Sequence, residues 1–174
     1  MKAKTIILIT KRILSGLLIL FWMWVIVSFS AQEGPQSANV SKRVASAAVT
    51  VEETIRGTTF TPEQRARRIE SLQFPVRKAA HASIYAVLGV LLFWHLHYYR
   101  LTKLEHFLLV WLLLTFFAIG DEIHQMFVPG RDGNPLDVAI DSTGGLIGIL
   151  FAGLVRRIFS GHKRWWFIIR KKAT

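Results

Sequence analysis

Four long apolar runs dominate the sequence and restrict the chain to folds that cross a membrane. They cover residues 13–29, 79–99, 107–120 and 138–155. A membrane-spanning helix needs about 20 mainly apolar residues, and the third run falls furthest short of that length. It becomes long enough only by including Leu104 and residues 123–127, which places Asp121 and Glu122 at a membrane boundary. The runs therefore predict an all-α integral membrane bundle of four transmembrane helices, with a long extracytoplasmic loop after the first.

The positive charge of the chain lies mostly on one side of this predicted bundle. The net charge is +11 although 52% of the residues are hydrophobic. With the N-terminus inside, the inner segments hold 13 of the 22 Lys and Arg residues but only Glu105 of the 11 acidic residues. Basic residues that flank spans are typical of the cytoplasmic face, where they meet anionic lipid. We expect a multi-pass protein of the cell membrane with both termini cytoplasmic and with membrane lipids, not nucleic acid, as partners. The oligomeric state stays open.

The sequence divides into four parts. Residues 1–30 are expected to form an N-terminal anchor helix, because the apolar run is longer than the ~7–15-residue apolar stretch inside a signal peptide; a cleaved signal is the alternative. Residues 31–74 are expected to be an extracytoplasmic loop that is flexible over 31–58. Residues 75–160 form the predicted three-helix membrane core. Residues 161–174 are a basic, aromatic cytoplasmic tail suited to an interfacial anchor.

Local signals mark two helix starts and one turn. Thr61, Pro62 and Gln64 fit a capping box that opens a short amphipathic helix to about residue 73, although a solvated connector is an equal alternative. Residues 129–130 are Pro-Gly, which suits a type II turn. Asn134 followed by Pro135 suits the start of the last span.

Polar residues gather near the predicted outer ends of the last three spans. They are Lys78, His81 and Tyr85 in the second, Asp121, Glu122 and Gln125 in the third, Asp137 and Asp141 in the fourth, and Arg131 in the loop between the last two. The spacing within the second and fourth spans puts their members on one helix face. We expect all of these residues to converge in one outward-facing pocket that binds a ligand.

Helix dipoles rank the acidic residues of this cluster. Asp137 and Asp141 lie in the first turns of a helix, where the dipole favours a carboxylate. Asp121 and Glu122 lie near a C-terminal end, where the dipole opposes them, so they need a cation; Lys78 and Arg131 are the candidates. Asp141 lies about one turn inside the apolar run, where a charge costs about 2–3 kcal/mol. Ion pairs that only fix helix packing are the alternative explanation.

Metal and cofactor sites are not expected from the remaining residues. The chain has no cysteine, which excludes disulfides, thiolate metal sites and a cysteine nucleophile. His124 lacks the second histidine one turn away that a zinc helix needs. Gly144 and Gly148 are four residues apart, a spacing typical of close helix approach in membranes.

Three ordered motifs resemble those of the VanZ-like family. They are Arg77-Lys78-Ala79-Ala80-His81 with Tyr85 and Leu88-Gly89, then Asp121-Glu122-Ile123-His124-Gln125 with Phe127-Val128-Pro129-Gly130-Arg131, then Asp137-Val138 with Asp141, Gly144-Gly145 and Gly148. The long first loop is similar to that of members from Gram-positive bacteria. The resemblance implies a membrane fold and a link to low-level teicoplanin resistance, but no reaction. Many members carry Asn where this chain has Asp141.

Two functions fit these observations. In the first, the pocket binds a cell-envelope lipid or a lipid-linked cell-wall precursor and alters glycopeptide access. In the second, the protein is an enzyme that modifies an envelope lipid, with His81 and either Asp121 or Glu122 as an acid/base pair. A transporter is disfavoured because the sequence has no internal repeat.

Overall fold

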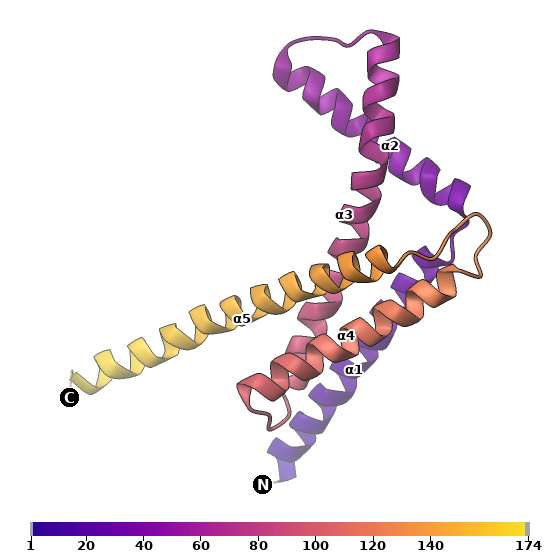
Figure 1. Cartoon of the computed structure of the whole chain (residues 1–174). Helices are drawn as coiled ribbons and strands as arrows, with labels where there is room; N and C mark the ends of the chain where they lie inside the picture. The colour runs from indigo at the N-terminus through magenta and orange to yellow at the C-terminus, as the bar shows by residue number, and fades with distance from the viewer. Residues whose placement is uncertain (1, 173–174) are drawn as a thin grey trace.

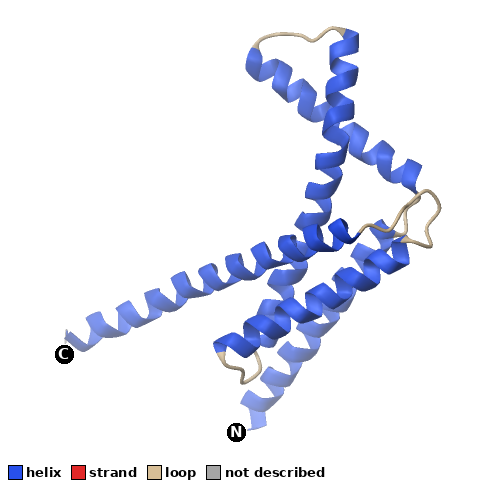
Figure 2. Ribbon diagram, in the orientation of Figure 1, coloured by secondary structure: helices blue, strands red, loops and turns tan. Residues whose placement is uncertain are grey.

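Helices make up almost all of the structure, a computed structural model that describes residues 2–172 and the side chains of residues 3–159. The helices are α1 (Lys2–Ser30), α2 (Gly34–Arg56), α3 (Pro62–Leu96), α4 (Lys103–Gln125) and α5 (Pro135–Lys172), and the described residues form no strand (Figures 1 and 2). Four segments are long and apolar enough to cross a membrane: Ala3–Ser30, Pro62–Leu96, Lys103–Gln125 and Pro135–Phe159. The prediction of an all-α bundle with four membrane helices is confirmed.

Helix α2 replaces most of the flexible segment that was expected over residues 31–58, so that expectation is wrong. The helix packs against α3 and buries Ser41, Ala45 and Val49, which are spaced one turn apart. Composition favoured disorder here, but a stripe of small residues lets the two helices pack closely. Figure 1 shows that α2 and the first part of α3 form a hairpin that extends away from α1, α4 and α5.

Helix α3 starts as predicted but does not stop near residue 73. The Thr61 hydroxyl accepts a hydrogen bond from Gln64 N, and the Gln64 side chain accepts one from Thr61 N, which completes the capping box. The helix then runs through Pro75 for 35 residues, or about 52 Å at 1.5 Å per residue. This length exceeds the ~30 Å hydrocarbon core of a bilayer. The expected amphipathic helix and the second span are therefore one continuous element.

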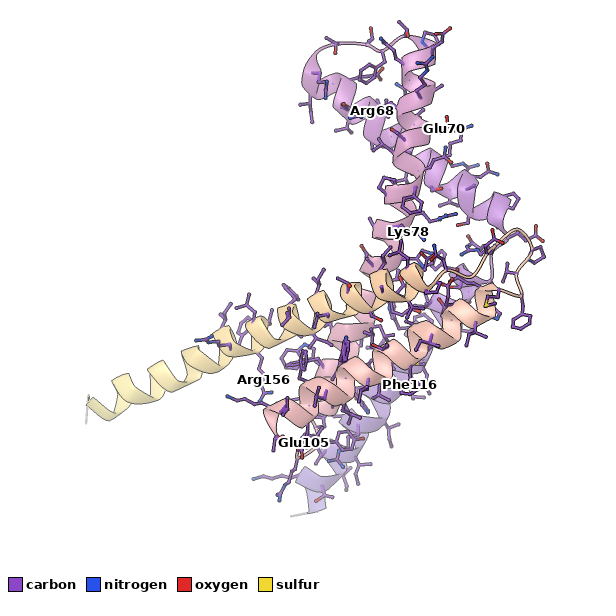
Figure 3. All side chains as sticks on the ribbon, in the orientation of Figure 1. Arg68, Glu70, Lys78, Glu105, Phe116 and Arg156 are labelled. Atoms are coloured by element: carbon purple, nitrogen blue, oxygen red, sulfur yellow. The ribbon has the colours of Figure 1, made fainter. Side chains whose placement is uncertain are left out.

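The hydrophobic core lies where α3 meets the other spanning helices. Its fully buried members include Ile26 of α1, Leu88 of α3, Leu114 of α4 and Ile149 of α5. Large apolar side chains also cover the outer surface of the bundle; Phe116, labelled in Figure 3, is 72% exposed. Exposed apolar side chains on helices of this length are what a lipid-facing surface requires.

Glycines allow α3 and α5 to pack at short range. A Cβ atom at Gly144 would collide with the carbonyl oxygen of Ala82, and one at Gly148 would collide with that of Ala86. The expected close approach is confirmed, and it determines which polar groups of α3 and α5 meet. The expected tail over residues 161–174 lies outside the described side chains.

The α3–α4 connection lies at one end of the bundle, and the α1–α2 and α4–α5 connections lie at the other end. The Arg12 guanidinium donates to the Tyr98 carbonyl oxygen at 2.7 Å, so the first turns of α1 lie beside the α3–α4 connection. At the other end, Gly34 N donates to the Pro129 carbonyl oxygen at 3.2 Å, which joins the α1–α2 and α4–α5 connections. Both pairs of neighbouring segments can be followed in Figure 1.

Candidate functional site

Asp121 is the centre of a buried hydrogen-bond network that joins three helices. Its Oδ2 atom accepts hydrogen bonds from Ser30 Oγ at 2.7 Å, from Tyr85 Oη at 3.2 Å and from Gln125 Nε2 at 3.2 Å. Asp121 is only 2% exposed. The sequence suggested that this carboxylate needs a cation. Neutral donors contact it directly instead. The cation contacts one of these donors, Gln125, and not the carboxylate itself.

Arg131 is that cation, and a tight turn positions it. Residues 128–131 form a turn in which Arg131 N donates to the Val128 carbonyl oxygen at 3.2 Å and Gly130 has a φ of 72°, as the predicted type II turn requires. The Arg131 side chain donates from Nη1 to Gln125 Oε1 and from Nε to the Gln32 carbonyl oxygen, both at 2.9 Å. It therefore ties the α1–α2 connection to the end of α4.

Glu122 contacts the start of α5 and has no direct cation partner among the described residues. Its Oε1 atom accepts a hydrogen bond from Asn134 N at 2.5 Å. Asn134 in turn caps α5, because its Oδ1 accepts from Leu136 N at 3.0 Å, and Pro135 is the first helical residue, as predicted. Glu122 thus fixes the α4–α5 connection, and the expectation that Lys78 or Arg131 would neutralise it directly is corrected.

On the polar face of α3, Tyr85 binds Asp121 of α4, whereas Lys78 and His81 meet acidic residues of α5. Lys78 forms an ion pair with Asp137, and His81 Nδ1 lies 3.8 Å from Asp141 Oδ2. The sequence predicted that Lys78 would neutralise the acidic residues of the third span and that His81 would pair with Asp121 or Glu122. The glycine contacts explain the difference, because they bring α5 against the face of α3 that carries Lys78 and His81.

Three carboxylates of the cluster retain acceptor capacity. Asp121 Oδ1, Glu122 Oε2 and Asp141 Oδ1 are buried without a hydrogen-bond partner in the described part of the chain. An unsatisfied buried acceptor costs about 1–3 kcal/mol, more when charged. A network kept only for packing does not need three such atoms, so this arrangement favours a functional role for the cluster.

A cavity of about 200 Å³ lies beside this network, between the end of α1, the first half of α2 and the middle of α3. Its apolar wall includes Phe29, Val40, Val44 and Ile84. Its polar lining includes Arg77, His81, Arg131, Gln32, Ser37 and Ser41, and no acidic residue. Of the residues that were predicted to form a pocket, only His81 and Arg131 line this cavity; the others form the network behind it or the ion pair beside it.

A family model described as VanZ/LLP1 matches residues 16–156 of the chain. The chain belongs to the VanZ/LLP1 family. This match confirms the VanZ-like resemblance and extends over all three motifs. No curated protein and no solved structure matches the chain.

The match with the VanZ/LLP1 family begins inside α1, and the structure shows what α1 supplies. Ser30, its last residue, is fully buried and binds Asp121. The sequence predicted this helix to be an anchor and did not indicate Ser30, Gln32 or Arg77 as site residues. Arg77 belongs to the motif of the second span. The candidate site residues of that span were those on the helix face of Lys78 and His81, and Arg77 was not among them. Ser30 carried no local signal, because a serine after an apolar run is common.

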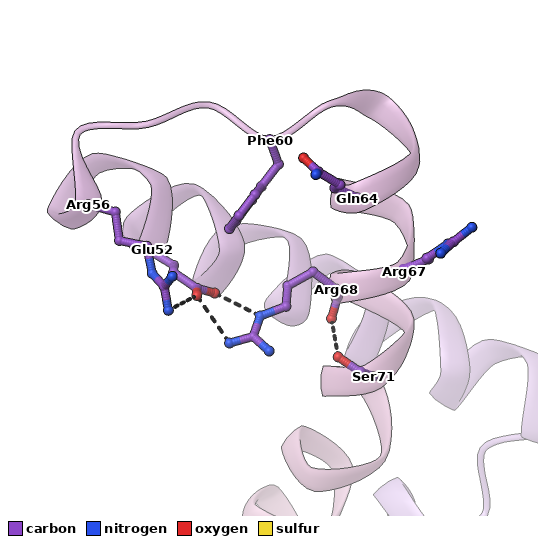
Figure 4. Close-up of a pocket in the computed structure, with 7 residues that line it drawn as sticks. All are labelled: Glu52, Arg56, Phe60, Gln64, Arg67, Arg68 and Ser71. Carbon is purple, nitrogen blue, oxygen red and sulfur yellow. Dashed lines mark hydrogen bonds and ion pairs between the residues drawn. The ribbon is translucent and has the colours of Figure 1, made fainter.

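This VanZ/LLP1 protein has a second hollow on the α2–α3 hairpin, about 480 Å³ in volume (Figure 4). Glu52 lies between Arg68, whose guanidinium donates to it at 3.0 and 3.1 Å, and Arg56, at 3.0 Å. The hydrogen bond from Arg68 lowers the pKa of Glu52, and the charges of Arg68 and Arg56 act in the same direction. Because the one carboxylate of the hollow is already paired with a guanidinium group of each helix, the hollow is best explained as an ion-paired clamp between α2 and α3.

No group of three or more His, Asp or Glu side chains among those described is placed to hold a metal ion. The His124 side chain is exposed and makes no hydrogen bond within the described part of the chain.

Proposed function

We propose that this member of the VanZ/LLP1 family binds a cell-envelope lipid or a lipid-linked wall precursor at an outward-facing polar site. Binding alters the access of glycopeptides such as teicoplanin to their target. The protein resides in the cell membrane with both termini in the cytoplasm, and the site faces outward.

One observation supports binding above all others. The cavity combines apolar side chains at the end of a membrane helix with two guanidinium groups and a histidine in the same lining. A lining that holds both apolar and charged side chains suits an amphiphilic ligand, because the hydrocarbon chain and the polar head of such a ligand require different surroundings. The carboxylates behind the cavity hold its cations in position through Gln125 and through the α4–α5 connection.

An enzyme that modifies an envelope lipid is the second candidate, and the position of His81 favours it. His81 lines the cavity and has Asp141 behind it at 3.8 Å. A histidine between a buried carboxylate and a ligand cavity can accept and return a proton. The acid/base pair of this hypothesis is therefore His81 with Asp141, in place of the Asp121 or Glu122 of the sequence-based hypothesis.

Analysis of a deletion strain separates these functions. The envelope lipids, the wall precursors and the binding of labelled teicoplanin are measured in the parent, in the deletion strain and in strains complemented with the wild-type chain or with Glu122→Gln. Changed antibiotic binding with an unchanged lipid and precursor profile supports binding without chemistry. A lipid species that accumulates or disappears supports the enzyme. Identical results in the parent and the deletion strain would contradict both.

A further inference from the structure

Two guanidinium groups from different elements line the same cavity. Arg77 belongs to α3, whereas Arg131 belongs to the α4–α5 connection. The Arg77 side chain makes no hydrogen bond or ion pair within the described residues, and Arg131 donates from Nε to the Gln32 carbonyl oxygen and from Nη1 to Gln125 Oε1. The donors of Arg77 and the Nη2 group of Arg131 therefore have no acceptor within the described part of the chain.

The two like charges are close enough to disfavour each other. Burial lowers the pKa of Arg131, and the positive charge of Arg77 lowers it further. Arginine nevertheless keeps its charge in proteins. Since none of the lining residues is acidic, an anion between the two groups would relieve this repulsion. Guanidinium groups bind phosphate with paired, charge-assisted hydrogen bonds.

Part of the cavity lining is apolar and open to the outside. Phe29, Val40 and Val44 are each at least half exposed, and Ile84 continues this wall on α3. Phe29 is the second-last residue of a membrane-spanning helix, so the apolar side of the cavity lies at the membrane boundary. A chain of methylene groups can leave the cavity past Phe29, toward the membrane.

We propose that this cavity binds the phosphate group of a membrane lipid, with Arg77 and Arg131 as its ligands and the hydrocarbon chain against Phe29, Val40 and Val44. This inference rests on the proposed function and names its ligand class, a lipid phosphate monoester or diphosphate. The cavity volume of about 200 Å³ is below the ~300–1,000 Å³ typical of pockets for drug-sized ligands. It accommodates the phosphate and the adjoining carbons, and any larger head group remains outside.

Native mass spectrometry of the full-length protein in detergent tests this inference. The probes are dioleoylphosphatidic acid, dioleoylglycerol, which has the same chains without the phosphate, and inorganic phosphate. The variants are Arg77→Gln and Arg131→Gln. Arg67→Gln is the matched control, since it removes the same charge from α3 at the distal hairpin. Because Arg131 also makes hydrogen bonds, Arg77→Gln is the decisive variant.

We expect phosphatidic acid to bind the wild type and Arg67→Gln equally, and to bind Arg77→Gln on the order of tenfold more weakly. Dioleoylglycerol should bind weakly to every variant. Equal binding of phosphatidic acid to Arg77→Gln and Arg67→Gln would overturn phosphate recognition here, while leaving the proposed lipid binding intact. Inorganic phosphate that binds as tightly as phosphatidic acid would overturn the lipid part. Failure of both lipids to bind the wild type would contradict the inference, and an unchanged deletion strain would separately contradict the proposed function.

Discussion

Ser30 Oγ donates a hydrogen bond to Asp121 Oδ2 at 2.7 Å, and both side chains are buried. This contact joins the last residue of α1 to a carboxylate near the end of α4, 91 positions away in the sequence. It makes α1 a structural component of the polar site. Removal of residues 1–30 as a signal peptide would leave Asp121 without its shortest hydrogen bond, so we expect the mature protein to retain them.

Ser30→Ala should lower the free energy of unfolding by about 1–2 kcal/mol, because a buried carboxylate loses a donor. Thermal unfolding in detergent measures this effect, and the intact mass of the purified protein shows whether α1 is retained. Ser28→Ala is the matched control, since Ser28 is exposed and bonds only within its own helix, to Trp24 O. Equal unfolding temperatures for the two variants, or a mass that lacks α1, would contradict this account.

The acidic network and Arg131 are expected to be needed for function more than for folding. Asp121→Asn, Glu122→Gln and Arg131→Ala should each abolish the effect on teicoplanin susceptibility that is proposed for the protein, while its amount in the membrane stays near that of the wild type. Asp132→Asn, at an exposed position next to Arg131, should have no effect and serves as the control. Loss of the first three variants from the membrane would show that the cluster is structural.

The orientation of the bundle can be tested with single cysteines, because the natural sequence has none. Thr58→Cys lies in the exposed α2–α3 connection, and Arg100→Cys lies in the exposed α3–α4 connection. An impermeant thiol reagent should label residue 58 in intact cells and residue 100 only after lysis, because the basic residues favour a cytoplasmic α3–α4 connection. Labelling of residue 100 in intact cells would show that the protein has the opposite orientation in the membrane.

Local sequence patterns predicted the features of this fold that depend on interactions within a single helix or turn. Span length follows from the apolar runs, and the capping residues Thr61 and Asn134 act within one turn of their own helix. Gly144 and Gly148 likewise indicated a close helix contact, which the structure places against Ala82 and Ala86. The pattern showed that a helix would approach but not which helix, because the partner depends on the packing of the whole bundle.

The features that the sequence missed depend on that packing. Lys78 meets Asp137, and His81 meets Asp141, because α3 lies against α5. Helix α2 exists because Ala45 and Val49 are buried against α3, although the composition around them is typical of a loop. Arg77 became a candidate only when the cavity brought it together with Arg131.

The α3–α5 contact predicts a sharp contrast among glycine substitutions. Gly144→Ala and Gly148→Ala should each lower the free energy of unfolding by about 1–3 kcal/mol, because the new methyl group meets backbone atoms of α3 that cannot move aside easily. Gly120→Ala and Gly153→Ala are matched controls, since a Cβ at either has no atom within 4 Å. Thermal unfolding in detergent measures all four. Equal tolerance at Gly144 and Gly153 would mean that α5 does not pack on α3 as described.

The last prediction separates the two proposed functions at His81. In an enzyme, the imidazole must accept and release a proton, so His81→Gln should eliminate activity even though glutamine keeps similar size and hydrogen-bonding capacity. In a binding protein, the glutamine amide can still donate to Asp141, which lies 3.8 Å from the imidazole, and the loss should be mild. Teicoplanin susceptibility and membrane abundance are measured together, with the exposed His124→Gln as control. Full activity of His81→Gln would exclude proton transfer by His81 and leave ligand binding beside Arg131 as the function of the site.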